Sequence, residues 1–412
     1  MTHLKKAWII WLVAAVYYSY EFFLRISPTV MVPDLMKAFS VDAATLGVLS
    51  ACYYYAYASL QIPVGILLDR FGIQLLLTLA AVMVAIGCFA FAHTDSLAIA
   101  ELGRVLMGMG SAFAFISCIK LARNWFSHTW LAVVIGLTNT LGVIGAISAE
   151  APLAHFVDIF SWRHSMWIAG FIGLALAILI FLIVRDRPQK VARDEKALVQ
   201  DFWKGFVIVI KNPRNWMIGL FGGLMVAPIS AFTELWGVPF FMQAHGLTRP
   251  HAALLSSFIF IGIACGGPLH GWISGQLKSR ITVLKYGVVF AFMTFVIVLY
   301  APITSMALLA TLLFIFGLST SSMLLCFAIN SEANPLFATG VSIGFTNMLV
   351  MAGGALFQPL VGHFLDRLAN AGSGTVVTHF STHDFQMALS VLLLCHIIAF
   401  ILVWFIRDRK YG

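Results

Sequence analysis

The sequence Gly65-Ile66-Leu67-Leu68-Asp69-Arg70-Phe71-Gly72 lies where two long apolar runs meet, one near 45–68 and the other near 73–92. Each run is close to the ~20 residues that a helix needs to cross a bilayer. Gly65 permits close approach of a neighbouring backbone, and the charged pair Asp69-Arg70 favours the membrane surface. We interpret this stretch as a short turn between two membrane-spanning helices.

The rest of the chain repeats this pattern of apolar runs and short polar turns. Hydrophobic residues make up 61% of the 412 residues and charged residues 10%, against about 25% charged residues in a soluble domain. The composition therefore predicts a polytopic membrane protein. Its twelve expected spans are 8–32, 45–68, 73–92, 97–121, 129–154, 162–184, 214–242, 251–276, 281–301, 303–329, 337–364 and 384–406.

The twelve spans form two sets of six that look like copies of one unit. A shift of 206 residues aligns Val32-Pro33 with Val238-Pro239. A shift of 208 aligns Gly136-Leu137-Thr138-Asn139 with Gly344-Phe345-Thr346-Asn347. An ordered series of matches at nearly constant offset indicates an internal duplication. We predict an all-α membrane protein with two pseudo-symmetric six-helix bundles.

The placement of charge predicts the topology. Most of the 25 Lys and Arg residues lie on the cytoplasmic side if both termini are cytoplasmic, as the positive-inside rule requires. The net charge of +8 therefore reports topology, and we expect no nucleic-acid partner. We predict bundles at 1–186 and 214–412, a cytoplasmic linker at 187–213, and a monomer in a bacterial inner membrane.

Along its whole length the chain resembles a transporter of the major facilitator superfamily. The most specific likeness is the stretch Gly65 to Gly72, although Ile73-Gln74 replace the basic residues that usually follow it. The resemblance implies two halves that rock around a site near the midplane. We expect Gly65, Asp69, Arg70 and Gly72 to act in gating, with Asp69 paired to the opposing half; a plain helix terminus is the alternative.

Two charged residues lie deep in the first span. Glu21 and Arg25 belong to the stretch Tyr17-Tyr18-Ser19-Tyr20-Glu21-Phe22-Phe23-Leu24-Arg25, roughly two thirds of the way across the bilayer. Charges at this depth normally face a cavity and mark function. Arg25 is expected to bind a substrate carboxylate and Glu21 to carry a proton. A self-neutralising salt bridge is the alternative.

Three further charges are expected to take part in proton coupling. Glu234 is alone in its span, and we place it across the cavity from Arg25. Glu150 and Arg104 lie at a similar depth, and Arg104 followed by small residues resembles a pattern that the superfamily associates with proton-linked transport. The alternative for Arg104 is a structural pair with Glu150 or Glu101.

Uncharged polar residues complete the expected substrate site. Most tyrosines occur in the first two spans, and we select Tyr17 and Tyr54 because a buried hydroxyl needs a partner. Asn139 and Asn347 occupy equivalent places in the two halves, and their amides can satisfy either end of a polar solute. Packing between the halves is the alternative reading of the two asparagines.

These residues predict a secondary active transporter and not an enzyme, with no metal or other cofactor. Its partners would be a small-molecule substrate, protons and the lipid bilayer. We expect proton-coupled uptake of a small zwitterionic or anionic solute such as an amino acid, short peptide or organic acid. A proton-coupled drug or metabolite exporter is the runner-up, although the Gly-Pro pattern typical of such exporters is missing from the fifth span. A non-transporting membrane sensor is the alternative of another class.

Overall fold

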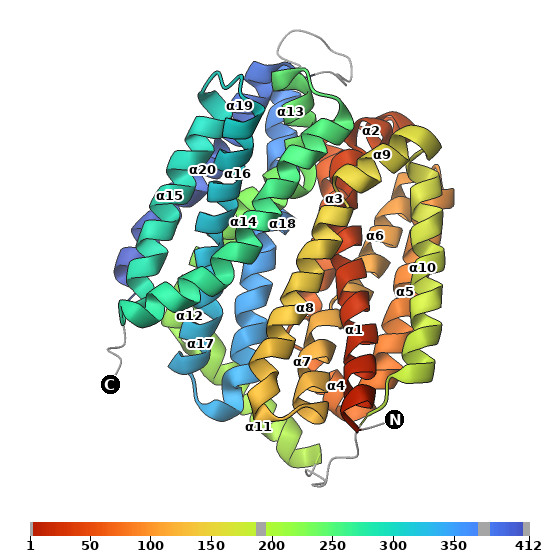
Figure 1. Ribbon diagram of the computed structural model, residues 1–412, viewed down its shortest axis with the longest axis vertical. Helices are drawn as coiled ribbons and strands as arrows, with labels where there is room; N and C mark the ends of the chain where they lie inside the picture. The colour runs from red at the N-terminus through yellow and green to blue at the C-terminus, as the bar shows by residue number, and fades with distance from the viewer. Residues whose placement is uncertain (1–2, 187–194, 370–379, 407–412) are drawn as a thin grey trace.

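The computed structural model describes residues 3–186, 195–369 and 380–406, and these residues form a bundle of helices with no strand (Figure 1). The first half comprises α1 (His3–Ile26), η1 (Ser27–Val30), α2 (Val32–Phe39), α3 (Ala43–Leu60), α4 (Val64–Phe71), α5 (Ile73–His93), α6 (Leu97–Ser111), α7 (Ala114–Trp125), α8 (His128–Ser148), α9 (Ala151–Phe160) and α10 (Trp162–Ile183). Helix α11 (Glu195–Lys211) lies within the expected linker. The second half comprises α12 (Pro213–Pro228), η2 (Ile229–Trp236), α13 (Gly237–His245), α14 (Arg249–Gln276), α15 (Arg280–Tyr300), α16 (Met306–Thr320), η3 (Ser321–Leu324), α17 (Leu325–Ala333), η4 (Leu336–Ala338), α18 (Thr339–Ala369), α19 (Thr382–Leu389) and α20 (Val391–Phe405).

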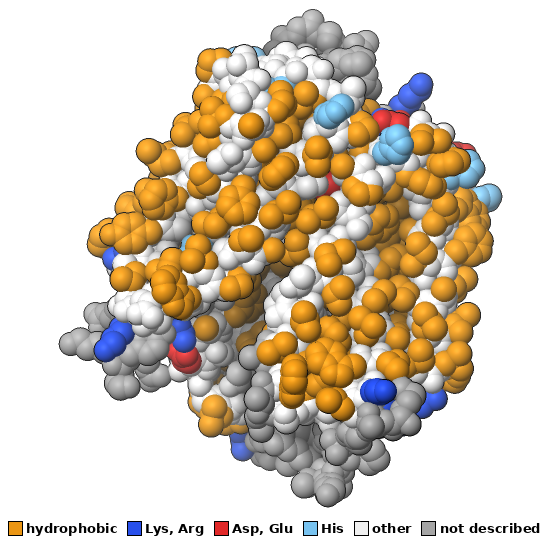
Figure 2. Space-filling model, viewed as in Figure 1, with side chains coloured by type: hydrophobic (Ala, Val, Ile, Leu, Met, Phe, Trp, Pro, Cys, Tyr) orange, Lys and Arg blue, Asp and Glu red, His pale blue; other side chains and the backbone are white. Residues whose placement is uncertain are grey.

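Eleven helical segments of the described residues are long and apolar enough to cross a membrane, or twelve if α2 and α3, which meet at 109°, count as one span. The expected span at 45–68 falls outside the eleven because four tyrosines lower the hydropathy of α3 and a break separates it from α4. Apolar side chains cover the lateral surface, while Lys and Arg gather near the ends (Figure 2). The prediction of a multi-pass helical membrane protein is confirmed.

Several spans are broken along their length. Pro228 ends α12 and is followed by the π-helix η2, which carries Glu234. Glu150 occupies the break between α8 and α9. Proline removes a backbone donor, and π-turns inside helices often mark functional positions. Both breaks therefore set a carboxylate at an irregular point of its span.

The two halves touch along α3 and α18, which pack antiparallel with their backbones close together. A Cβ on Gly47 would lie 2.6 Å from the carbonyl oxygen of Gln358, and one on Gly344 would lie 2.7 Å from that of Gln61. Only glycine fits at such approaches. These glycines therefore fix the register of the contact between the halves.

The two ends of the bundle differ. At the upper end in Figure 1, Arg249 Nη1 of the second half lies 2.8 Å from Asp34 Oδ2 and 3.3 Å from Asp158 Oδ1 of the first half. At the lower end, a Cβ on Gly65 or Gly340 would meet no atom within 4 Å. Figure 2 shows the surface hollowed between α8 and α14 toward this end. The halves are thus joined above and parted below.

Candidate binding site between the two halves

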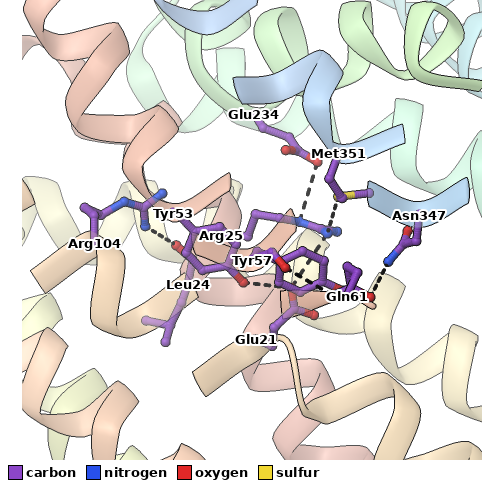
Figure 3. A network of polar contacts seen from close by, with 10 residues as sticks. All are labelled: Glu21, Leu24, Arg25, Tyr53, Tyr57, Gln61, Arg104, Glu234, Asn347 and Met351. Carbon is purple, nitrogen blue, oxygen red and sulfur yellow. Dashed lines mark hydrogen bonds and ion pairs between the residues drawn. The ribbon is translucent and has the colours of Figure 1, made fainter. Parts of the chain in front are cut away.

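An arginine of the first half lies between two carboxylates, one from each half. Arg25 Nη1 is 3.6 Å from Glu21 Oε1 on the preceding turn of α1, and Arg25 Nε is 3.8 Å from Glu234 Oε1 in η2 (Figure 3). All three side chains are at most 7% exposed. The structure thus brings together three of the five deep charges that the sequence singled out.

These ion pairs are longer than hydrogen bonds, which for N–H donors to oxygen measure about 2.7–3.2 Å. Arg25 Nε, Glu21 Oε2 and Glu234 Oε2 are buried without a hydrogen-bond partner among the described residues. Buried polar atoms normally have partners, and exceptions indicate a functional site. The guanidinium therefore retains donor capacity for a further acceptor.

Neighbouring side chains hold Glu21 and Arg25 in place. Tyr53 Oη donates to Glu21 Oε1 at 2.8 Å. The Arg25 guanidinium stacks over the Phe22 ring at 3.9 Å, and its Nη1 lies 3.9 Å from Met351 Sδ of α18. A cation gains favourable contact with an aromatic face without giving up its hydrogen-bond donors. This arrangement orients Arg25 toward the second half.

Polar groups continue the site along α3 and α18. Asn347 Nδ2 donates to Gln61 Oε1 at 2.8 Å, a contact between the halves. Tyr57 stacks on Tyr53, with ring centroids 6.0 Å apart. The Tyr54 hydroxyl is buried without a hydrogen-bond partner in the described ranges. Hydroxyl and amide groups thus lie beside the charges, where a polar solute could use them.

Arg104 has a different environment. Its Nη1 donates to the Leu24 carbonyl oxygen at 3.0 Å and its Nη2 to the Ser50 carbonyl oxygen at 3.3 Å, while its guanidinium lies 4.9 Å from the centre of the Tyr53 ring. It has no carboxylate within ion-pair distance in the described ranges, so the expected alternative of a pair with Glu150 or Glu101 is wrong. Arg104 ties together backbone of the first half.

The other expected residues lie apart from this network. Glu150 is fully buried, and neither of its carboxylate oxygens has a hydrogen-bond partner among the described residues. Tyr17 is buried against α6, where its hydroxyl donates to the Gly110 carbonyl oxygen at 3.1 Å. Asn139 is exposed on α8. Of the two equivalent asparagines, only Asn347 belongs to the Arg25 network.

The expected gating stretch is paired inside its own half. Lys120 Nζ of α7 lies 2.5 Å from Asp69 Oδ1 and donates to the Gly65 carbonyl oxygen at 2.6 Å. The expectation that Asp69 pairs with the opposing half is therefore not met, because the halves are parted at this end. Arg70 lies against the Phe71 ring at 5.3 Å.

The backbone conformation at position 72 requires glycine. Its φ of +84° favours glycine, and a Cβ would lie 2.7 Å from Asp186 Oδ2. The Asp186 carboxylate accepts from the Ile73 amide at 2.8 Å and the Gln74 amide at 3.3 Å. A carboxylate at a helix N-terminus is stabilising, so Gly72 leaves room for Asp186 to cap α5.

Sequence reasoning missed Gln61, Tyr53 and Lys120. Tyr53 belongs to the tyrosine cluster, but the sequence does not tell which of its members faces Glu21. Gln61 directly follows α3, and a polar residue before Pro63 in an apolar span was an available signal. Among the described residues no group of three or more His, Cys, Asp or Glu side chains could hold a metal ion.

The chain matches the sequence model of the Major Facilitator Superfamily over residues 10–358. It is 25% identical over 362 residues to the hexuronate transporter of Bacillus subtilis, with 83% of this chain and 84% of that protein covered. It is 22% identical to a probable hexose phosphate transport protein of Chlamydia trachomatis (94% and 88% covered) and 22% identical to the membrane sensor protein UhpC of Salmonella typhimurium (65% and 63% covered). A crystal structure of a bacterial homologue of the human lysosomal transporter Spinster superposes with a TM-score of 0.79 at 16% identity, covering 97% of each chain, which shows the shared fold.

Proposed function

The chain belongs to the Major Facilitator Superfamily of transporters, and we propose that it takes up a small organic acid into the cytoplasm together with a proton. The observation that carries this proposal is Arg25, a buried guanidinium at the contact between the halves with unused donor capacity. Guanidinium matches a carboxylate in a bidentate geometry. A relative named a hexuronate transporter supports an acidic substrate.

Substrate binding would begin at Arg25. The carboxylate of the solute approaches from the open lower end and accepts hydrogen bonds from the guanidinium, where the present ion pairs to Glu21 and Glu234 are 3.6 and 3.8 Å long. Hydroxyl groups of the solute can then bond with Asn347, Gln61 and the unpartnered Tyr54 hydroxyl. The charge of Arg25 selects for an acidic solute, and the polar side chains of Asn347, Gln61 and Tyr54 orient the rest of that solute.

Proton coupling would follow from competition for one cation. When a substrate carboxylate takes Arg25, Glu234 is left buried without its counter-ion. An uncompensated buried charge is strongly destabilising, so protonation of Glu234 accompanies substrate binding. Glu21 keeps the Tyr53 hydroxyl as a donor and is better able to stay charged. Glu150 is the second candidate proton carrier, because neither oxygen of its buried carboxylate has a hydrogen-bond partner among the described residues.

We further propose that the lower end is cytoplasmic and that the membrane is a bacterial inner membrane. Lys120, Arg185 and Arg280 belong to the excess of basic residues near this end, which the positive-inside rule places in the cytoplasm. With the lower end open, the structure would represent the inward-facing state of alternating access.

Uptake into proteoliposomes tests this function. An inward proton gradient should drive accumulation of a labelled hexuronate, and the protonophore-treated vesicles should only equilibrate. Arg25→Lys should abolish accumulation, whereas Arg163→Lys, at an exposed ion pair with Asp95 within the first half, should not.

Other outcomes of the same assay would replace the proposal. Accumulation of an amino acid or dipeptide in place of the hexuronate would move the substrate class to zwitterions. Loss of a preloaded cationic drug against the gradient would indicate the exporter. Saturable binding of hexuronate without flux in any gradient would favour a sensor.

A further inference from the structure

The pattern Gly-x-x-Leu-Asp-Arg occurs at two places in the chain. Gly65-Ile66-Leu67-Leu68-Asp69-Arg70 lies in α4 at the lower end, and Gly362-His363-Phe364-Leu365-Asp366-Arg367 lies in α18 at the upper end. The separation does not follow the half-length repeat, so the second copy is not the duplicated equivalent of the first. The two copies end the two antiparallel helical spans that join the halves.

The upper copy is engaged with the opposite half. Asp366 Oδ1 accepts from the Ala43 amide at 3.0 Å, and its Oδ2 accepts from the Ala44 amide at 2.7 Å. These amides are the free donors of the first turn of α3, which favour a negative charge. A Cβ on Gly362 would lie 2.2 Å from the Ala43 carbonyl oxygen, so the glycine lets α18 reach α3.

The lower copy is disengaged. Asp69 is paired with Lys120 of its own half, and a Cβ on Gly65 would meet no atom within 4 Å. On α18 the same holds for Gly340, in the first turn of that helix. The glycine and the aspartate of this copy therefore have no contact of the kind that their counterparts make above.

The packing register shows where the lower copy would engage. Gln61 faces Gly344 across the α3–α18 contact. Four residues further along the first span and four residues back along α18, Gly65 would face Gly340. Asp69 would then lie near the first-turn amides of α18, as Asp366 lies at those of α3. The break at Gln61 to Pro63 separates α4 from α3 and supplies a hinge for this movement.

We propose that Gly362 to Arg367 is an upper latch that closes the outer side, and that it alternates with the Gly65 to Arg70 latch. In the present structure the upper latch is closed and the lower one is open. In the opposite state Asp366 leaves α3 while Asp69 caps α18, so one helix N-terminus loses its carboxylate as the other gains one. This inference rests on alternating access, but not on the substrate or on proton coupling.

Disulfide cross-linking in the full-length protein tests the exchange. Phe71→Cys, two residues after Asp69, and Leu336→Cys, three residues before the start of α18, place one thiol on each half and leave Gly65 and Gly340 unchanged. Both side chains are exposed in the present structure, so the two thiols should cross-link only when the lower end closes. Cys265 is the exposed native cysteine and is replaced by serine in the background. Asp366→Asn removes the charge on α3 and should speed cross-linking about tenfold, because charge-assisted hydrogen bonds are among the stronger ones.

Asp384→Asn is the matched control. Asp384 also accepts from a helix N-terminus, the Ser381 amide at 2.8 Å, but within the second half. It should leave the cross-linking rate unchanged. Equal rates in the Asp366 and Asp384 variants would overturn the upper latch. If Asp366→Asn does not yield folded protein, Gly362→Ala should also speed cross-linking, because its Cβ forces α18 away from Ala43.

The cross-linking result is separable from the proposed function. Variants that keep hexuronate uptake but show no change in cross-linking would overturn the latch alone. Faster cross-linking in Asp366→Asn, together with failure of the wild-type protein to accumulate hexuronate, would support the latch and contradict the substrate assignment. Absence of the cross-link between positions 71 and 336 in every variant, with uptake intact, would show that the lower end closes in another register and would overturn the alternation.

Discussion

Arg25 and Arg104 are both buried guanidinium groups of the first half, and they lie close together, since Arg104 bonds the carbonyl of Leu24. Their partners are of opposite kinds. Arg104 bonds backbone carbonyls of α1 and α3, all in one half, whereas Arg25 faces carboxylates from both halves. The depth of a charge in the membrane therefore identifies a costly residue, and the location of its partners indicates what the residue does.

Contacts within one half and contacts between halves have different fates in a rocking transporter. A hydrogen bond inside a half persists through the cycle and stabilises that half. A contact between halves changes during the cycle and can be tied to a ligand that competes for it. On this basis Arg104 is expected to be a structural residue and Arg25 the binding residue.

The largest expected effect is the loss of transport in Arg25→Ala. Removing one partner from a buried charge pair costs about 2–5 kcal/mol, so we expect substrate affinity to fall by about thirtyfold or more. Isothermal titration with hexuronate and uptake in proteoliposomes would measure it. Arg104→Ala is the paired variant and should keep affinity within about threefold if its role is structural. Equal losses of affinity in the two variants would erase the distinction between the two arginines.

The next effect is on coupling and concerns Glu234. Glu234→Gln keeps the shape and one acceptor but cannot take up a proton. We expect gradient-driven accumulation to fall to simple equilibration, because the neutral amide cannot carry the coupled proton, while substrate exchange continues. Counterflow and accumulation assays run side by side would separate the two. Glu332→Gln, at a lower-end ion pair with Arg280, is the control.

Persistence of accumulation in Glu234→Gln would contradict the assignment of Glu234 and direct attention to Glu150. Among the described residues the Glu150 carboxylate makes no ion pair with Arg25 and no hydrogen bond, so its protonation would not be linked to substrate binding through Arg25. Glu150→Gln would then abolish accumulation without changing hexuronate affinity.

A third prediction concerns stability. Arg104→Met fills a similar volume but removes the two hydrogen bonds from the guanidinium to the Leu24 and Ser50 carbonyls, and a hydrogen bond to a charged group contributes about 1.5–3 kcal/mol. Thermal unfolding in detergent should occur at lower temperature than in the wild type, with exchange activity retained below the transition. Arg25→Met should be less destabilising, because Glu21 and Glu234 can each take up a proton when their cation is removed, whereas the hydrogen bonds lost with Arg104 are not replaced. The reverse order of unfolding temperatures would contradict this reading of Arg104.

Much of the fold could be predicted from the sequence, because a membrane span leaves a long apolar run and the repeat leaves matches at constant offset. The expected pairing of Arg25 with Glu234 across the halves also followed from the rarity of deep charges. The breaks at Pro228 and Glu150 were harder to predict, since a proline or carboxylate in a span does not specify a π-helix or a bend.

The partners of individual side chains were the least predictable part of the site. Arg104 bonds backbone carbonyls, which every residue carries, so no residue type in the sequence reports them. Asp366 occurs in a visible copy of the loop pattern, but its partner is a backbone amide in the other half. Helix packing decides such contacts, and only the three-dimensional structure reveals them.

The smallest expected effect uses Tyr53, which touches both arginine environments. Its hydroxyl donates to Glu21 and its ring lies against Arg104. Tyr53→Phe keeps the ring and removes the hydroxyl, so the Arg104 side is preserved. The loss of one hydrogen bond to a charged group, about 1.5 kcal/mol, should change hexuronate affinity about tenfold or less through Glu21, with little change in unfolding temperature.

Comparison with Tyr53→Leu separates the role of the Tyr53 hydroxyl at Glu21 from the role of its ring at Arg104. Leucine removes both the hydroxyl and the aromatic face beside Arg104, worth about 0.5–2 kcal/mol when desolvated. It should therefore lower the unfolding temperature further than phenylalanine does, while weakening hexuronate binding to the same extent. A Phe variant that is as unstable as the Leu variant but binds hexuronate normally would show that the hydroxyl supports the packing of the first half. Arg25 and Arg104 would then still differ in their roles in binding and in stability, but Tyr53, which lies between them, would serve stability alone.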